Sequence, residues 1–213
     1  MTYGELVALA GNLECFDLAL LVQGLDERRD AILVQLSRFM KAGKVVGLRR
    51  GMYTLPDAYR RVSLSPARLA NQLYHPSYLS GLWALAAHDL IPERVVWLTS
   101  VTPRPPHRFE NSFGVFDYRN LKQDAFFGYA PLRYGEVDAL VAESEKALLD
   151  LWHLGPGEWT VERLVEMRYQ NTERVSAEKL RDYAERFRSQ RLLRAAARFL
   201  ELAKEEEEGT VSL

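Results

Sequence analysis

Cysteine is almost absent from this 213-residue chain, which contains only Cys15. A single cysteine excludes an internal disulfide and any metal site built from a cysteine cluster. The four histidines are scattered, without the paired spacing of a zinc site. They are His75, His88, His107 and His153. We therefore expect a protein that binds no metal and no other cofactor.

Long hydrophobic runs are also missing, although hydrophobic residues make up 47% of the chain. No stretch reaches the roughly 20 apolar residues of a membrane-spanning helix. The N-terminus, Met-Thr-Tyr-Gly-Glu, lacks the basic start and the apolar core of a signal peptide. These absences predict a cytoplasmic protein that does not associate with a membrane.

Catalytic motifs are missing as well. The sequence has no glycine-rich phosphate loop and no Gly-x-Ser-x-Gly elbow. A nuclease core needs an acidic residue, one spacer and a lysine at the end of a strand, but residues 144–146 read Ser-Glu-Lys, with serine in the acidic position. We expect no enzymatic activity. A nuclease-like enzyme that uses Glu143 and Asp138 is the alternative in this class.

What the sequence does contain is a helix and hairpin pattern over residues 26–56. Asp26 suits the N-cap, because its carboxylate can accept from the free amides of the first turn. Gly43 suits the left-handed position that ends a helix. Residues 45–55 predict two short strands joined by the turn Arg49-Arg50-Gly51. Apolar residues at helical spacing predict one buried stripe, formed by Ile32, Leu33, Leu36, Phe39 and Met40.

Two further helices are expected before this segment, one over residues 3–11 and one with Asp17 as its N-cap that ends at about Gly24. Three helices followed by a hairpin is the order of a winged helix-turn-helix. In such a module the third helix enters the major groove of DNA, and the wing lies along the backbone or in the minor groove.

The charge distribution agrees with this interpretation. Residues 28–61 contain nine Lys or Arg and two acidic residues, a net charge of +7, whereas the whole chain has a net charge of −1. A local basic patch on a neutral protein is typical of a protein that binds the phosphate backbone. The alternative is an ordinary solvated helix beside a basic hairpin. The candidate DNA-binding residues are Arg28, Arg29, Gln35, Arg38, Lys41, Arg49 and Arg50.

The rest of the chain predicts a second, larger domain. A helix from Ser77 to His88, strands over 95–101 and 113–119, short strands near 132–134 and 137–142, and an amphipathic helix over 144–152 give a mixed α/β pattern. Residues 102–108 are expected to form a loop, and the last third is expected to be helical. The predicted fold is α+β, with a winged helix-turn-helix at 1–60 and a mixed α/β domain with a helical C-terminal extension at 61–213.

Several segments resemble one family in the same order along the chain. Residues 34–44 and 48–55 resemble the N-terminal winged helix of the AbiEi-type antitoxins, which are transcriptional regulators of type IV toxin–antitoxin systems. The matches that follow are Pro76-Ser-Tyr-Leu-Ser80, Leu90-Ile-Pro92, Thr99-Ser-Val-Thr102, Phe113-Gly-Val-Phe-Asp-Tyr118 and Glu145-Lys-Ala-Leu-Leu-Asp150. The resemblance covers residues 15–155 and extends only loosely into the C-terminus.

This resemblance implies a repressor that binds double-stranded DNA at the promoter of its own operon. It also implies a functional link to a nucleotidyltransferase-like toxin, without a stable complex. The third helix and the wing inherit the DNA-contact role, and the remainder inherits the antitoxin role. The loop from Arg104 to Arg108 departs from the family, because prolines interrupt it where relatives are more densely basic.

A third hypothesis is an interaction module in which a basic C-terminus contacts RNA or a protein. Five arginines are compatible with this function: Arg186, Arg188, Arg191, Arg194 and Arg198. Acidic residues are interleaved with them, as on an ordinary solvated helix.

Overall fold

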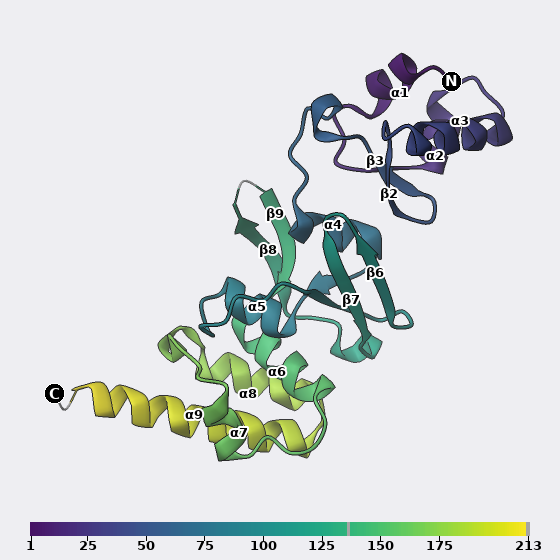
Figure 1. Ribbon diagram of the computed structural model, residues 1–213. Coiled ribbons are helices and arrows are strands. Elements are labelled where there is room, and N and C mark those ends of the chain that lie inside the picture. The colour runs from purple at the N-terminus through teal and green to yellow at the C-terminus, as the bar shows by residue number, and fades with distance from the viewer. Residues whose placement is uncertain (136, 212–213) are drawn as a thin grey trace.

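The computed structural model describes residues 1–135 and 137–211, apart from the side chains of residues 206–208, 210 and 211. The fold is α+β, as the sequence predicts, with two β-sheets and a helical C-terminal third. The molecule is elongated, with α1, α2 and α3 at one end and α6–α9 at the other (Figure 1). None of the described helices is both long and apolar enough to cross a membrane.

The N-terminal segment contains three helices and a small antiparallel sheet, in which the strand order is β1-β3-β2. The elements are α1 (Tyr3–Ala10), β1 (Phe16–Asp17), α2 (Leu18–Gly24), α3 (Arg29–Lys41), β2 (Val46–Arg49) and β3 (Met52–Thr54).

Side-chain caps explain where the first two helices begin. The Thr2 hydroxyl accepts a hydrogen bond from the backbone N–H of Glu5, and the Glu5 carboxylate accepts one from the N–H of Thr2. Asp17 caps α2 by accepting from the N–H of Leu20 at 2.8 Å, as predicted. The expected cap at Asp26 is wrong, because α3 begins two residues later, with Arg28 at its N-cap and no side-chain hydrogen bond there.

The end of α3 follows the prediction. Gly43 has a φ of +67°, and the N–H of Lys44 donates to the carbonyl of Phe39 at 2.8 Å. A residue with a Cβ is strained at this φ, which explains why glycine ends the helix.

The central part is built on a six-stranded mixed sheet with the order β6-β7-β5-β4-β9-β8. Strands β5 and β7 are parallel, as are β4 and β9, and the other neighbours are antiparallel. The strands are β4 (Tyr78–Leu79), β5 (Leu98–Thr102), β6 (His107–Asn111), β7 (Gly114–Asn120), β8 (Tyr129–Tyr134) and β9 (Val137–Ala142).

Three local predictions need correction in this region. The helix expected from Ser77 begins later, because residues 78 and 79 pair with β5 and β9 before α5 starts at Gly81, with Ser80 at the N-cap. The strand expected from Val95 starts at Leu98. The expected loop at 102–108 ends early, because β6 begins at His107, directly after the prolines.

Helices cover the sheet and extend the molecule. Below the sheet in Figure 1, α5 and α6 lie between it and the C-terminal helices α7–α9. The remaining elements are η1 (Asp57–Tyr59), α4 (Pro66–Leu73), α5 (Gly81–Ala87), η2 (Gln123–Ala125), α6 (Ser144–Leu154), α7 (Val161–Glu166), η3 (Thr172–Arg174), α8 (Ala177–Arg186) and α9 (Gln190–Val211). Helix α6 was expected to be amphipathic, but it is not, because it is buried on several sides.

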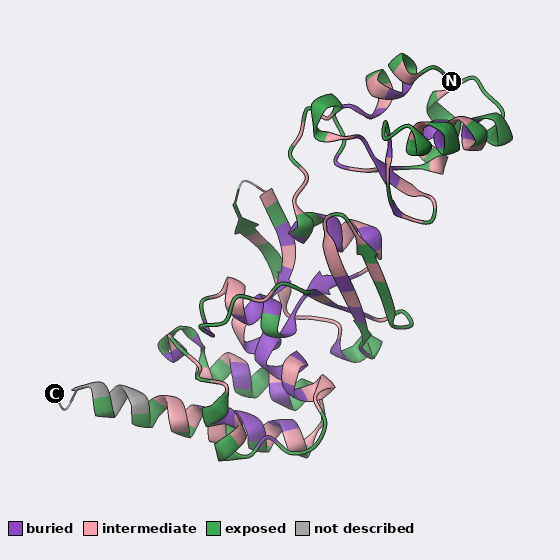
Figure 2. Cartoon of the chain, in the orientation of Figure 1, coloured by how far each residue is buried: buried purple, intermediate pink, exposed green. Residues whose placement is uncertain are grey.

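The buried residues form two separate hydrophobic clusters (Figure 2). The smaller, N-terminal cluster consists of residues between Met1 and Leu55, with Leu6, Leu21 and Ile32 fully buried. The larger, central cluster extends from α4 to α9 and also takes in Leu48 from β2. Nearly all of the N-terminal segment therefore packs around its own cluster, and Leu48 is the buried residue that joins the two parts.

Candidate nucleic-acid interface

Helix α3 has one continuous exposed stripe. Ile32 and Leu36 are buried in the N-terminal cluster, and a helix turns by about 100° per residue, so the opposite face lies in solvent. The side chains of Arg38 and Lys41 form no hydrogen bond or ion pair with other described residues, so both cations are available to a ligand. We call this surface the exposed stripe; it consists of Asp30, Ala31, Val34, Ser37, Arg38 and Lys41.

Three of the predicted DNA-binding residues flank the exposed stripe. Arg28 and Arg29 are exposed at the start of α3, and neither side chain has a partner among the described residues. The Glu27 carboxylate does not neutralise them directly, because it pairs with the amino group of Met1. Gln35 is half-buried at the edge of the stripe. A cation in the first turn opposes the helix dipole, so a bound phosphate would relieve an unfavourable interaction.

The structure separates the two arginines of the predicted wing tip. Arg50 is exposed in a two-residue turn with Gly51, whose φ is +78°. Arg49 belongs to β2 and not to the turn. Its Nε donates to the carbonyl of Leu73 at 2.7 Å, and its Nη1 donates to the carbonyl of Arg50 at 3.0 Å. Arg50 is therefore available for DNA, whereas Arg49 holds the hairpin against α4.

A β-bulge explains how the hairpin is attached to the central part. The pairing of β2 with β3 shifts between Gly47 and Arg49, which leaves Leu48 unpaired. A bulge redirects a side chain, and here Leu48 enters the central cluster. The amide of Asn111 on β6 donates to the carbonyl of Leu48 at 3.1 Å. Leu48 and Arg49 thus fix the hairpin, and Met52 on β3 also packs against the central cluster.

Other cations of the basic segment are used inside the protein. Arg60 is buried, and it donates to the carbonyls of Val62 and Leu55 at 2.8 Å and forms an ion pair with Asp57. Lys44 lies over the ring of Tyr3, with Nζ 5.1 Å from the ring centroid. The net charge of the segment therefore overstates how many cations a ligand can reach.

The two carboxylates of the nuclease alternative are not brought together. Asp138 is the second residue of β9 and pairs with Arg133, whereas Glu143 directly follows the last residue of that strand. Five residues of extended strand separate them by roughly 16 Å, too far to share a metal ion. Glu143 accepts from the Tyr183 hydroxyl at 2.6 Å and pairs with Lys179 at 2.9 Å. Burial tends to raise its pKa, but these two partners outweigh it, so the pKa of Glu143 is lowered.

Lys146, the lysine of the same alternative, is fully buried in an ion pair with Asp150. The other carboxylate oxygen of Asp150 accepts from the Ser80 hydroxyl at 2.7 Å and from the Tyr78 hydroxyl at 3.1 Å. Burial lowers the pKa of Lys146, and the charge of Asp150 opposes that shift. Both side chains are fully buried and paired with each other, so they form a structural pair without access for a substrate. In the described part of the chain no group of three His, Cys, Asp or Glu residues has the arrangement of a metal site.

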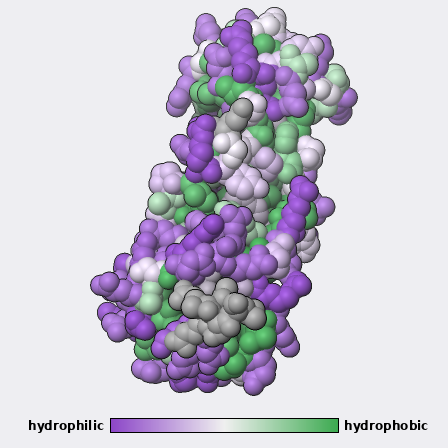
Figure 3. Space-filling model, turned by 90° about the vertical axis from the view of Figure 1, so that its left-hand side faces the viewer, coloured by the Kyte–Doolittle hydropathy of each residue, from purple (hydrophilic) through white to green (hydrophobic). Residues whose placement is uncertain are grey.

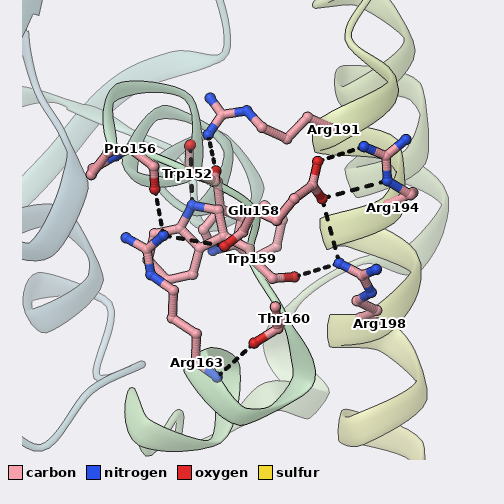
Figure 4. Close-up of polar contacts among 10 residues, drawn as sticks. Trp152, Pro156, Glu158, Trp159, Thr160, Arg163, Arg191, Arg194 and Arg198 are labelled. Carbon is pink, nitrogen blue, oxygen red and sulfur yellow. Dashed lines mark hydrogen bonds and ion pairs between the residues drawn. The ribbon is translucent and has the colours of Figure 1, made fainter.

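The C-terminal arginines mostly bind the protein itself. Arg191 donates to the carbonyls of His153, Gly155 and Gly157, at 2.9, 3.0 and 2.7 Å. Figure 4 shows α9 presenting Arg191, Arg194 and Arg198 to the loop that connects α6 and α7. There Arg194 pairs with Glu158 at 2.5 Å and Arg198 donates to the carbonyl of Trp159 at 2.8 Å. The guanidinium of Arg186 stacks on Phe127, 3.5 Å from the ring centroid. Of these five arginines, Arg188 alone is exposed without a partner among the described residues.

Val34 and Ser37 are among the members of the exposed stripe that the sequence interpretation missed. Projection of the helix at 100° per residue places both opposite Ile32, so the signal was present in the sequence. Val34 escaped attention because an apolar residue in a helix is usually assigned to the core.

Hydrophilic residues cover most of the side of the molecule shown in Figure 3, and hydrophobic residues form smaller patches between them. The chain matches no model of a known protein family and no curated protein sequence.

Proposed function

We propose that the protein is a sequence-specific DNA-binding repressor that acts at its own promoter, with α3 as the reading helix of a winged helix-turn-helix. The observation that carries the proposal is the exposed stripe, with Arg38 and Lys41 unpartnered on it and Arg50 unpartnered on the neighbouring hairpin. An arginine or lysine that already binds carbonyl or carboxylate groups of the protein would attract a DNA phosphate only weakly. These three are not neutralised in that way.

The dimensions of α3 suit the major groove. Its 13 residues extend over about 20 Å, and the groove is wide enough to admit one helix. On the stripe, Arg38 can donate to guanine, and Gln35 at its edge can pair with adenine. Lys41, Arg50 and one of the two arginines at the start of α3 would contact phosphates.

The resemblance to AbiEi-type antitoxins extends the proposal to an antitoxin function of the central and C-terminal parts. The expected partner is a nucleotidyltransferase-like toxin that is opposed without a stable complex. Coexpression with the toxin encoded beside this gene tests this part separately, because rescue of growth should persist when DNA binding is removed by Arg38→Ala with Lys41→Ala. Loss of rescue in a correctly folded double variant would contradict a separate antitoxin function.

The DNA-binding part is tested by fluorescence anisotropy on a labelled duplex from the protein's own upstream region, with a scrambled duplex for comparison. Three phosphate contacts predict a slope of log affinity against log salt of about −2.7, and about a fortyfold loss of affinity between about 50 and 200 mM salt. We expect a clear preference for the native duplex over the scrambled one.

Matched variants connect the result to α3. Arg38→Ala with Lys41→Ala should weaken binding to both duplexes, reduce the salt slope by about 1 and diminish the preference for the native one. Arg181→Ala, an exposed and unpartnered arginine on α8, is the control and should leave binding unchanged. Equal affinity of the parent for both duplexes would overturn the proposal.

A further inference from the structure

Val34 is the only large apolar side chain on the exposed stripe of α3. It is 51% exposed and lies on the face opposite Ile32 and Leu36, which are buried in the N-terminal cluster. The protein's own structure gives no reason for a valine here. A β-branched residue is a weaker helix former than alanine, and at this position it packs against no core.

The residues around Val34 on the stripe are either small or positively charged, which allows a large, negatively charged partner to approach closely. Ala31 precedes it by nearly one turn and Ser37 follows it by nearly one turn, and both are small. Arg38 and Lys41 continue the same stripe toward the end of the helix, and neither has a partner in the described chain. Because Ala31 and Ser37 are small, they do not keep a partner away from Val34. Once Arg38 and Lys41 have bound a negatively charged partner, the Val34 side chain can contact its surface.

In the major groove only thymine presents an apolar group, its 5-methyl, and valine methyl groups make favourable contacts with it. We propose that Val34 recognises a thymine methyl group in the operator and so determines specificity at one T·A base pair. This inference rests on the proposed function, because it requires α3 to lie in the major groove. It adds a recognition that hydrogen-bonding residues cannot provide, since they do not sense the methyl group.

The test compares the native upstream duplex with the same duplex in which uracil replaces every thymine. Uracil keeps all hydrogen-bonding groups and removes only the methyl. Burial of one methyl group corresponds to about fourfold in affinity, so the parent should bind the uracil duplex at least about fourfold more weakly. Val34→Ala should bind the thymine duplex about as weakly as the parent binds the uracil duplex, and should lose most of the difference between the two duplexes.

Two variants control for other effects of the substitution. Val22→Ala removes a valine that is 40% exposed on α2, and it should keep the full difference between thymine and uracil duplexes. Val34→Ile keeps the apolar contact and should keep the difference too. Alanine favours the helix, so Val34→Ala should fold at least as well as the parent.

The outcomes separate this inference from the proposed function. If the parent prefers the native duplex to a scrambled one but Val34→Ala keeps the full uracil effect, the thymine contact is wrong and the repressor proposal stands. The same holds if the parent shows no uracil effect. If the parent does not prefer the native duplex at all, both proposals fall. In that case an unchanged affinity of Val34→Ala for DNA would direct the search for a ligand of Val34 toward a protein.

Discussion

At the scale of single residues, the two adjacent arginines of the hairpin have different surroundings. Arg50 lies in the turn without a partner in the described chain, whereas Arg49 donates hydrogen bonds to two backbone carbonyls. A local sequence pattern cannot distinguish them, because the acceptor of Arg49 is Leu73, 24 residues further along the chain. The sequence identifies both as basic residues near a turn, and only the tertiary contact separates their functions.

A pair of single variants checks this difference. Arg50→Ala should reduce the slope of log affinity against log salt by about 1 and leave thermal stability unchanged, because it removes the one phosphate contact that we propose for it. Arg49→Ala leaves the Leu73 carbonyl without its donor and should lower the free energy of unfolding by about 1–3 kcal/mol. Titrations at several salt concentrations and chemical denaturation measure the two effects. Equal stability losses in both variants would contradict the assignment.

The buried pair of Lys146 and Asp150 gives a second prediction at this scale. Removal of one partner leaves an uncompensated charge in the core, so Lys146→Met or Asp150→Asn alone should cost about 3–5 kcal/mol of the free energy of unfolding. The double variant Lys146→Met with Asp150→Asn removes both charges and should be less destabilised than the sum of the two. Urea denaturation of all four proteins measures this coupling, and simple additivity would show that the pair does not act as a unit.

At the scale of elements, the helix ends and the strands were predictable to different degrees. Asp17 and Gly43 act as predicted because a cap depends on neighbours within a few residues. The helix expected to begin at Ser77 was wrong because Tyr78 and Leu79 pair with strands that lie elsewhere in the sequence. Strand β6 was missed because it is short, polar and preceded by prolines, and β7 supplies its hydrogen bonds.

The loop between α6 and α7 depends on α9, and this dependence gives a prediction. Arg191 donates hydrogen bonds to the loop carbonyls of Gly155 and Gly157 and to the carbonyl of His153 in the last turn of α6. Arg194 forms a surface ion pair with Glu158. Arg191→Ala should therefore cost about 2–3 kcal/mol of the free energy of unfolding. The matched variant Arg194→Ala should cost clearly less, because solvent screens its exposed ion pair. Chemical denaturation compares the two. If both variants lost the same small amount of the free energy of unfolding, the hydrogen bonds from Arg191 would not stabilise the loop.

Helix α6 also provides a pH dependence through His153, which is half-buried. Burial lowers its pKa below the ordinary value of 6.5 against the opposing charge of Asp150, and the cations of Arg191 and Lys146 lower it further. The unfolded chain then takes up a proton before the folded chain does. The free energy of unfolding should thus be unaffected by His153 above about pH 7 and fall as the pH drops below 6.5. His153→Gln should flatten this decline in urea denaturation between about pH 7 and 5.5. A parallel decline in parent and variant would exclude His153 as its source.

At the scale of the whole molecule, the hairpin brings Leu48 from the N-terminal segment into the central cluster, and Glu14 and Cys15 add side-chain hydrogen bonds with Gln72 on α4. The sequence predicts a division near residue 60, and that division stays a prediction; the clusters show that the N-terminal residues pack mainly with one another. The attachment could not be foreseen, because it depends on a β-bulge that moves a single leucine from one cluster to the other. For the proposed repressor this attachment matters, since it fixes the position of α3 relative to the central part.

Two truncations in the same hairpin test this attachment. Val45 and Leu48 are each 3% exposed, but Val45 belongs to the N-terminal cluster and Leu48 to the central one. Leu48→Ala should cost about 2–5 kcal/mol and loosen the edge strand β6, because Asn111 on that strand donates to the Leu48 carbonyl. Hydrogen exchange should then quicken at the amides of His107–Asn111. Val45→Ala should quicken exchange in α3 and the hairpin and leave β6 protected. If both variants left β6 equally protected, Leu48 would not couple the two clusters, and the contacts of Arg49 and Met52 would hold the hairpin in place.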